Sequence, residues 1–152
     1  MAFPQGFWIL ILVSALLSSI GFKKYVWFLS IGYGLVLEAA ADREKSAQKK
    51  LRPDMTATEG LYKMCRCPNY FGEIILWTGV FVSGIGVLEG WQWLVAGLGY
   101  VTIVYVMFSG AKRLEKRQNK NYGDKEEYRA YVEKTPILIP LIPLYHLVKE
   151  EK

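Results

Sequence analysis

Histidine and cysteine are scarce in this sequence, which has one histidine, His146, and two cysteines, Cys65 and Cys67, among 152 residues. A closed metal site needs about four ligands, and the histidine lies far along the chain from the cysteine pair. A disulfide across the single residue between the cysteines would be strained. The sequence therefore predicts no metal site, and we expect both thiols to be free.

The sequence also has fewer polar residues than an ordinary soluble domain, since 52% of the residues are hydrophobic and 14% aromatic. Four apolar runs are each near the roughly 17–25 residues needed to cross a bilayer: 7–22, 25–41, 70–88 and 91–110. The first run has no basic leader and no convincing cleavage site, so we expect a retained helix. The prediction is an all-α integral membrane protein with about four transmembrane helices. It forms a single membrane domain over residues 1–152, with two N-terminal transmembrane helices in residues 7–41.

Lysine and arginine gather in two segments, residues 43–66 and 112–134, and these segments hold most of the net charge of +5. If all four runs span, both segments lie on one side of the membrane, and the short opposite connections carry few charges. The positive-inside rule then places the N-terminus, the middle loop and the C-terminal tail on the cytosolic, matrix or stromal side. Membrane lipids with anionic headgroups explain this charge without a nucleic acid, and a phosphate-bearing cofactor is the alternative.

Residues 60–73 combine polar groups and turn residues at the start of the third run. Pro68 and Asn69 favour a turn or a helix start, so Glu73 is expected one turn inside an apolar helix. A carboxylate there indicates a functional site unless it reaches water from the helix end. Glu38 and Asp42 share a face of the second helix, where they are either solvated or part of a polar pocket.

The C-terminal third is predicted to contain short elements. The fourth helix is expected to end near residues 109–110 and to be followed by a charged helix over 112–120 and a turn at 122–124. A second short helix over 126–134 is expected to expose Tyr128 and Tyr131. The proline-broken segment 136–145 is predicted to be extended and interfacial or re-entrant, either closing over a groove between the helices or lying on the membrane.

Several spaced motifs carry a family resemblance. The main one consists of Gly60-Leu61-Tyr62-Lys63 followed by Arg66-Cys67-Pro68-Asn69-Tyr70-Phe71-Gly72-Glu73. It resembles the Gly-Leu-aromatic…Arg-His-Pro-Asn-Tyr-Phe-Gly-Glu signature of the steroid 5-alpha-reductase-like membrane proteins (DUF1295). Residues 37–43 and 109–140 are similar to the segments that flank this signature in the family, so the likeness covers roughly residues 30–145. Sterol C14 reductases and isoprenylcysteine carboxyl methyltransferases share a looser version.

The resemblance implies that residues 60–145 form the cofactor half of an NADPH-dependent reductase acting on an activated double bond in a lipid. Arginine suits phosphate oxygens, and asparagine can both donate to and accept from a carboxamide. Glu38 and Asp42 would hold ribose or amide groups. The other cofactor-binding residues implied by position are Arg66, Asn69, Tyr70, Glu73, Glu115 and Tyr128.

The chain departs from the family at two places. Cys67 stands where the family has histidine, and only one and a half helices precede the matching region, where larger members have additional helices for the lipid pocket. These departures favour an alternative function, a catalytically inactive structural subunit of a membrane complex whose partners are other subunits. A second alternative is a methyltransferase that uses S-adenosylmethionine, although the Pro-Asn-Tyr-Phe-Gly-Glu form is typical of the reductases.

Overall fold

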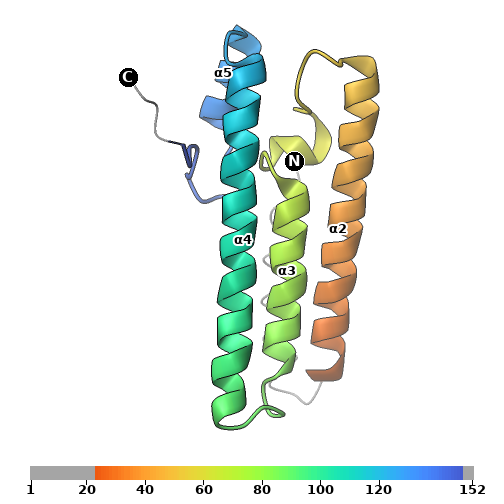
Figure 1. Ribbon diagram of the computed structural model, residues 1–152. Coiled ribbons are helices and arrows are strands. Elements are labelled where there is room, and N and C mark those ends of the chain that lie inside the picture. The colour runs from red at the N-terminus through yellow and green to blue at the C-terminus, as the bar shows by residue number, and fades with distance from the viewer. Residues whose placement is uncertain (1–22, 149–152) are drawn as a thin grey trace.

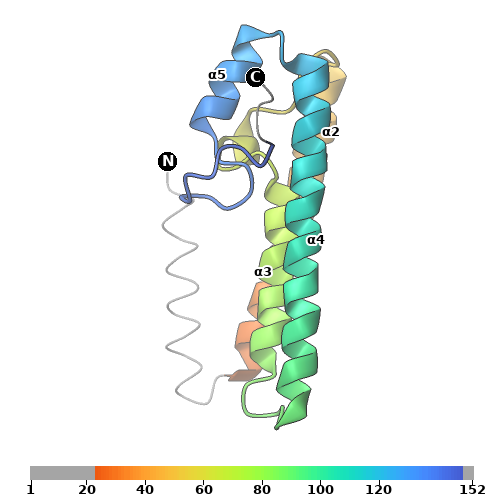
Figure 2. The ribbon, with the colours of Figure 1, turned by 60° about the vertical axis from the view of Figure 1, so that its left-hand side comes forward.

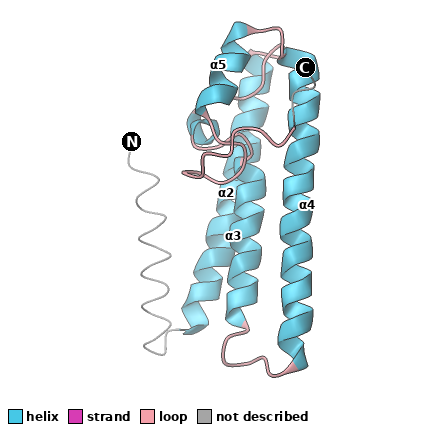
Figure 3. Cartoon of the chain, turned by 90° about the vertical axis from the view of Figure 1, so that its left-hand side faces the viewer, coloured by secondary structure: helices cyan, strands magenta, loops and turns pink. Residues whose placement is uncertain are grey.

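The computed structural model describes residues 23–148, with side chains from Leu29 onward. The first predicted apolar run, residues 7–22, lies outside the described residues. Within the described part, every regular element is a helix (Figure 3). The all-α prediction is therefore confirmed for this part of the chain.

Three long helices lie side by side (Figure 1): α2 (Lys23–Leu51), α3 (Pro68–Ser83) and α4 (Trp91–Tyr122). Helix α3 contacts both of the others. A 3-10 helix, η1 (Gly60–Lys63), and a short helix, α5 (Glu126–Lys134), lie at one end of this bundle. The chain that follows α5 folds back over the same end (Figure 2). All the polar connections between residues 52 and 67 are also at this end.

Helices α2 and α3 approach closely because a glycine of each lies at their contact. A Cβ atom added to Gly34 would be 2.7 Å from the carbonyl oxygen of Gly72, and one added to Gly72 would be 2.8 Å from that of Gly34. Only hydrogen atoms fit at such separations. Helix α2 continues to Leu51, as predicted from the absence of a helix breaker before Pro53.

Helix α3 begins at Pro68, so the structure has the helix start rather than the turn, the two alternatives predicted there. The helix ends earlier than the apolar run does. Gly84 caps the helix, and Gly86 takes a left-handed conformation with φ 81°. The predicted continuation to residue 88 is therefore wrong, because the glycines that follow Ser83 favour a turn. At 16 residues α3 is short for a helix that spans a bilayer alone.

Helix α4 contradicts the prediction of a helix end near residues 109–110, since it runs without a break to Tyr122. Gly110 packs against the ring of Tyr70, with 3.3 Å between an added Cβ and the ring. Ala111, Glu115 and Gln118 are buried on the same side of the helix. These contacts outweigh the modest helix-breaking tendency of one glycine, about 1 kcal/mol.

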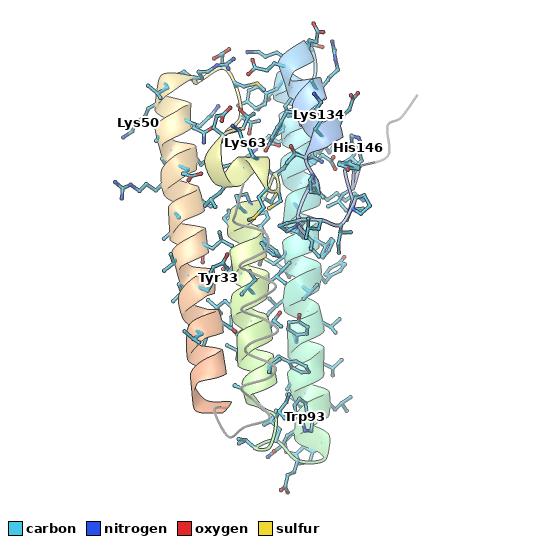
Figure 4. The ribbon with its side chains drawn as sticks, turned by 180° about the vertical axis from the view of Figure 1, so that it is seen from behind. Tyr33, Lys50, Lys63, Trp93, Lys134 and His146 are labelled. Atoms are coloured by element: carbon cyan, nitrogen blue, oxygen red, sulfur yellow. The ribbon has the colours of Figure 1, made fainter. Side chains whose placement is uncertain are left out.

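The described chain has two regions of opposite surface character. We call residues 42–67 and 111–148 the cap, and residues 29–41 and 68–110 the stem. Buried apolar side chains gather in the cap and in the adjoining turns of the stem, whereas many large apolar side chains of the stem are exposed. Figure 4 shows Lys50, Lys63, Lys134 and His146 in the cap and Trp93 at the far end of the stem. By length and composition, α4 is the one described helix that could cross a membrane.

Candidate functional site

The centre of the candidate site is a buried ion pair between the cap loop and α4. Arg66 follows η1, and its backbone N–H donates to the carbonyl of Pro136 at 2.9 Å. Its Nη2 atom lies 2.9 Å from Oε1 of Glu115, and the two side chains are only 1% and 0% exposed. The structure therefore brings together two predicted cofactor residues that are far apart in sequence.

Residues 136–148, which we call the strap, close over this ion pair. The backbone N–H groups of Leu147 and Val148 donate to Oε2 of Glu115 at 2.8 and 2.9 Å. His146 places Nδ1 3.4 Å from Oε1 of the same carboxylate. Ile137 and Leu138 fix the start of the strap in the buried core. Of the two arrangements predicted for this non-helical segment, the structure therefore has the one that closes over the helices.

The guanidinium of Arg66 has hydrogen bonds on one side only. Nη2 donates to Glu115 and also to the carbonyl of Tyr145. Nε and Nη1 are buried and make no hydrogen bond of good geometry to a described residue, although the Tyr128 hydroxyl lies close enough to the Arg66 side chain to act as a weak partner. An unpaired buried donor costs on the order of 1–3 kcal/mol, so donors held this weakly are candidates for binding a ligand acceptor.

Tyr128 lies close to the same guanidinium and is buried, so the prediction of an exposed side chain is wrong. Its hydroxyl donates to Oδ1 of Asn119 at 2.6 Å. Burial raises the pKa of Tyr128 to about 12, although the Arg66 charge opposes this shift. Tyr128 therefore stays protonated at neutral pH.

Tyr131 was not among the predicted cofactor residues, yet it borders the site. Its side chain was predicted to be exposed and is not, so that prediction is wrong. Its hydroxyl donates to the carbonyl of Tyr62 at 2.7 Å. Burial raises the pKa of Tyr131, and the nearby Arg66 charge opposes the rise. The three-residue spacing from Tyr128 places both rings on one face of α5, and this spacing was the signal available in the sequence.

Asn69 and Tyr70 lie in the first turn of α3, next to the ion pair in sequence. Tyr70 packs against the buried cluster formed by Cys67, Ala111 and Leu138. Asn69 is half-buried, and its amide makes no hydrogen bond to a described residue. Asn69 thus keeps its hydrogen-bonding capacity for a ligand, whereas Tyr70 contributes to the core.

The remaining predicted residues, Glu38, Asp42 and Glu73, form a separate acidic group between α2 and α3. Glu38 is close enough to the other two for their charges to interact. Glu73 accepts a hydrogen bond from the indole of Trp77 at 2.9 Å. No ion pair joins these carboxylates to Arg66 or to another described cation. The eight predicted residues therefore divide into two groups.

The thiols of Cys65 and Cys67 are both free, as predicted from the sequence, and both are buried. Cys67 lies in the apolar cluster beneath the strap. Burial raises the pKa of Cys67 to about 12 and also raises that of Cys65. Neither thiol is a thiolate at neutral pH, so neither suits nucleophilic or metal chemistry there.

A comparison of the sequence with models of protein families identifies the family of this chain. The family model described as "Protein of unknown function (DUF1295)" matches residues 5–135. The chain belongs to the DUF1295 family. This confirms the predicted family membership. No curated protein and no solved structure matches the chain.

The family match covers one part of the candidate site of this DUF1295 protein and leaves out the strap. Arg66, Glu115 and Tyr128 lie within the matched residues, whereas the strap begins after the match ends. The matched part supplies the ion pair and the two unpaired donors of Arg66. The strap supplies the backbone groups that cover them. Chemically, the arrangement offers a fixed cation close to a protonated phenol, a pair suited to binding a polar anionic ligand.

Proposed function

We propose that this DUF1295 protein is an integral membrane reductase, similar to steroid 5-alpha-reductases, that uses NADPH to reduce an activated double bond in a lipid. The stem is the membrane-embedded region, since its exposed surface is rich in large apolar side chains and α4 is long enough to span. About four helices span in all, and the cap faces the cytosol, matrix or stroma. This placement puts the cofactor site at the water-facing end of a lipid-contacting bundle.

The observation that carries the proposal is the pair of unpaired donors on Arg66. A guanidinium held on one side by Glu115 has its remaining N–H groups pre-oriented, because rotation would break the buried ion pair. Phosphate oxygens satisfy such donors in the planar geometry that arginine favours. NADPH carries phosphates, so in this proposal these donors are the groups that would hold a phosphate of the cofactor.

Each residue of the site has a separate role in this proposal. Arg66 binds phosphate, Glu115 holds Arg66 in place, and Asn69 binds the carboxamide of the nicotinamide. Tyr128 remains protonated and donates a hydrogen bond. The carboxylates Glu38, Asp42 and Glu73 accept hydrogen bonds from ribose hydroxyls. The bound cofactor supplies the hydride, and the protein supplies orientation and exclusion of water.

A second candidate function, a catalytically inactive subunit of a membrane complex, is favoured by the strap. The strap provides protein groups for both Glu115 oxygens and for Nη2 of Arg66, so much of the site is occupied by the chain itself. Cys67 adds to this view, since a buried thiol replaces the polar histidine of the family signature.

Cofactor binding to the purified full-length protein tests the two functions. We expect saturable NADPH binding by calorimetry, lost in Asn69→Ala and kept in Asn121→Ala, an exposed asparagine at the end of α4. Binding of S-adenosylmethionine with the same dependence on Asn69 would instead indicate methyl transfer. If neither ligand binds at near-millimolar concentration while the chain co-purifies with fixed partners, the reductase proposal fails and the subunit function stands.

A further inference from the structure

One face of α4 is exposed on both sides of residues 107–110, which are half-buried, and it differs in character between the two sides. In the stem, this face carries large apolar side chains, among them Leu94, Leu98, Val101 and Tyr105. These residues are three or four positions apart, so they form a continuous stripe along the helix. The stripe ends near residues 107–110, where the helix enters the cap.

The same stripe continues into the cap as a basic surface. Lys112 lies two turns beyond Tyr105, which lies two turns beyond Leu98, so the three side chains point in nearly the same direction. The exposed cations on this side of the helix, which we call the basic face, are Lys112, Arg113, Lys116, Arg117 and Lys120.

The cations of the basic face have no partner among the described residues and cannot turn inward. None of them forms an ion pair with a described residue. The opposite side of α4 is fixed by Ala111, Glu115 and Gln118, which are buried against the rest of the cap. From Lys112 to Lys120 the basic face extends about 12 Å along the helix axis. It is therefore a concentrated positive surface directly beyond the apolar stripe, with no counter-charge paired to it in the described part of the chain.

We propose that the basic face binds the headgroups of anionic phospholipids in the leaflet next to the cap. Basic clusters immediately beyond a membrane helix attract such lipids. A bilayer is favoured over a partner helix because contacts between membrane helices are rich in small residues, whereas this stripe presents leucine, valine and tyrosine. The inference rests on the membrane placement in the proposed function, but it is independent of NADPH.

The contribution of each cation to lipid binding should fall with its distance from the apolar stripe along the axis of α4. Lys112 and Lys116 lie at the bottom of the basic face. Lys120 lies about 12 Å above Lys112, which exceeds the Debye length of roughly 8 Å at physiological salt. Lys50 lies at the far tip of the cap (Figure 4). Removal of the lower lysines should therefore weaken lipid binding more than removal of the upper ones.

The experiment compares two double variants with the same loss of charge, Lys112→Gln/Lys116→Gln and the control Lys50→Gln/Lys120→Gln. Each full-length protein is reconstituted in phosphatidylcholine bilayers with a trace of spin-labelled phosphatidylglycerol or phosphatidylcholine. The immobilised fraction in electron paramagnetic resonance spectra gives the relative association constant of the two lipids. One cation at the membrane surface strengthens the binding of an anionic lipid on the order of fivefold. The measured association constant is an average over all lipids in contact with the protein. We therefore expect the relative association constant to fall at least about twofold in Lys112→Gln/Lys116→Gln.

Two results would overturn the proposal: equal effects of the two variants, which would indicate a general charge effect, or no preference for phosphatidylglycerol in the wild type. Inositol hexakisphosphate, a soluble phosphate compound, is added in excess as a competitor for the basic face. It should not abolish the preference for phosphatidylglycerol, because the apolar stripe holds the basic face at the bilayer surface. Extraction of membranes with alkaline carbonate checks the placement separately. Release of the wild type by carbonate would refute the membrane placement itself, whereas retention without a lipid preference refutes only the headgroup site.

Discussion

In the cap, Leu138 is completely buried while lysines cover the surface, whereas in the stem Leu98 is 62% exposed on the outer face of α4. The two regions share two continuous helices, α2 and α4, so the difference does not come from their secondary structure. The cap buries apolar side chains within itself, as a water-soluble domain does, whereas the stem leaves many of them on its outer surface. In the proposed function, this difference reflects the surroundings, with the cap in water and the stem in lipid.

The stabilising tertiary contacts of the described chain are unevenly distributed. Two of the four buried clusters have all their buried residues in the cap, and the other two join the cap to the adjoining turns of the stem. The rest of the stem is held by the close glycine contact of α2 with α3 and by contacts of Tyr100 with Thr78 and Phe81. Changes to buried groups of the cap should therefore have large effects on stability, and changes to the outer face of the stem small ones.

The largest expected effect is that of Glu115→Ala. This substitution leaves Arg66 buried without a counter-charge and also removes the acceptor of two strap N–H groups. Breaking a buried ion pair typically costs about 3–5 kcal/mol. We expect a loss of this size in the free energy of unfolding, measured by denaturant titration in detergent micelles.

The matched control is the exposed pair of Arg52 and Glu127, 2.7 Å apart with both side chains 53% exposed. Glu127→Ala should change stability by about 0–1 kcal/mol, since surface pairs are screened by water and salt. The double variant Arg66→Met/Glu115→Leu should recover much of the loss. Similar effects for Glu115→Ala and Glu127→Ala would show that the cap has no dry interior.

The next largest effect compares two leucines. Leu138→Ala removes a fully buried side chain from the cap core and should cost about 2–5 kcal/mol. Leu98→Ala removes an exposed side chain from the apolar stripe, and we expect a change within about 0.5 kcal/mol. Thermal unfolding in the same detergent measures both. A larger effect for Leu98 would mean that the outer face of α4 is covered by protein rather than by lipid or detergent.

A smaller effect is expected inside the stem, where two glycines of α2 provide a matched pair. Gly34→Ala would place a methyl group against the backbone of α3, and overpacking of this kind costs about 1–3 kcal/mol. Gly32 has open space around it, so Gly32→Ala should be neutral or stabilising by up to about 1 kcal/mol. Unfolding curves that rank the two variants in the reverse order would refute the close approach of α2 and α3.

The sequence alone predicted the elements that follow from local rules. The continuation of α2 past Glu38 depends on the absence of a helix breaker and is confirmed. At Pro68 the sequence left a turn and a helix start open, and the structure has the helix start, two residues before the predicted apolar run. The continuity of α4 through Gly110 was missed, because it depends on tertiary contacts with Tyr70 that a local pattern does not contain.

The site was predicted less completely than the fold. The resemblance selected Arg66 and Glu115 as members of one site, but their direct ion pair depends on how α4 packs against the cap loop. It also grouped Glu38, Asp42 and Glu73 with them, although these carboxylates lie between α2 and α3. The burial of Tyr128 was missed because helix α5 packs on Met55, a long-range contact.

The stem and the cap meet on the exposed face of α4, where thiol labelling can locate the boundary residue by residue. The native thiols provide a low background, since both are buried and burial raises the pKa of Cys67 to about 12. Unfolded thiols ionise near pH 9, so the stability that depends on the protonated thiols is complete below that pH and decreases as the pH rises towards 12. Labelling at pH 7.4 or so therefore leaves the fold unperturbed.

The membrane placement of the stem is tested most directly by single cysteines on the exposed face of α4, treated in membranes with a membrane-impermeant maleimide. The positions are Leu94, Leu98, Tyr105, Lys112, Lys116 and Lys120. We expect almost no labelling at Leu98 and Tyr105 and rapid labelling at Lys116 and Lys120, with the change between Tyr105 and Lys112. Uniformly rapid labelling along the whole face would contradict this placement, because the stem would then lie in water.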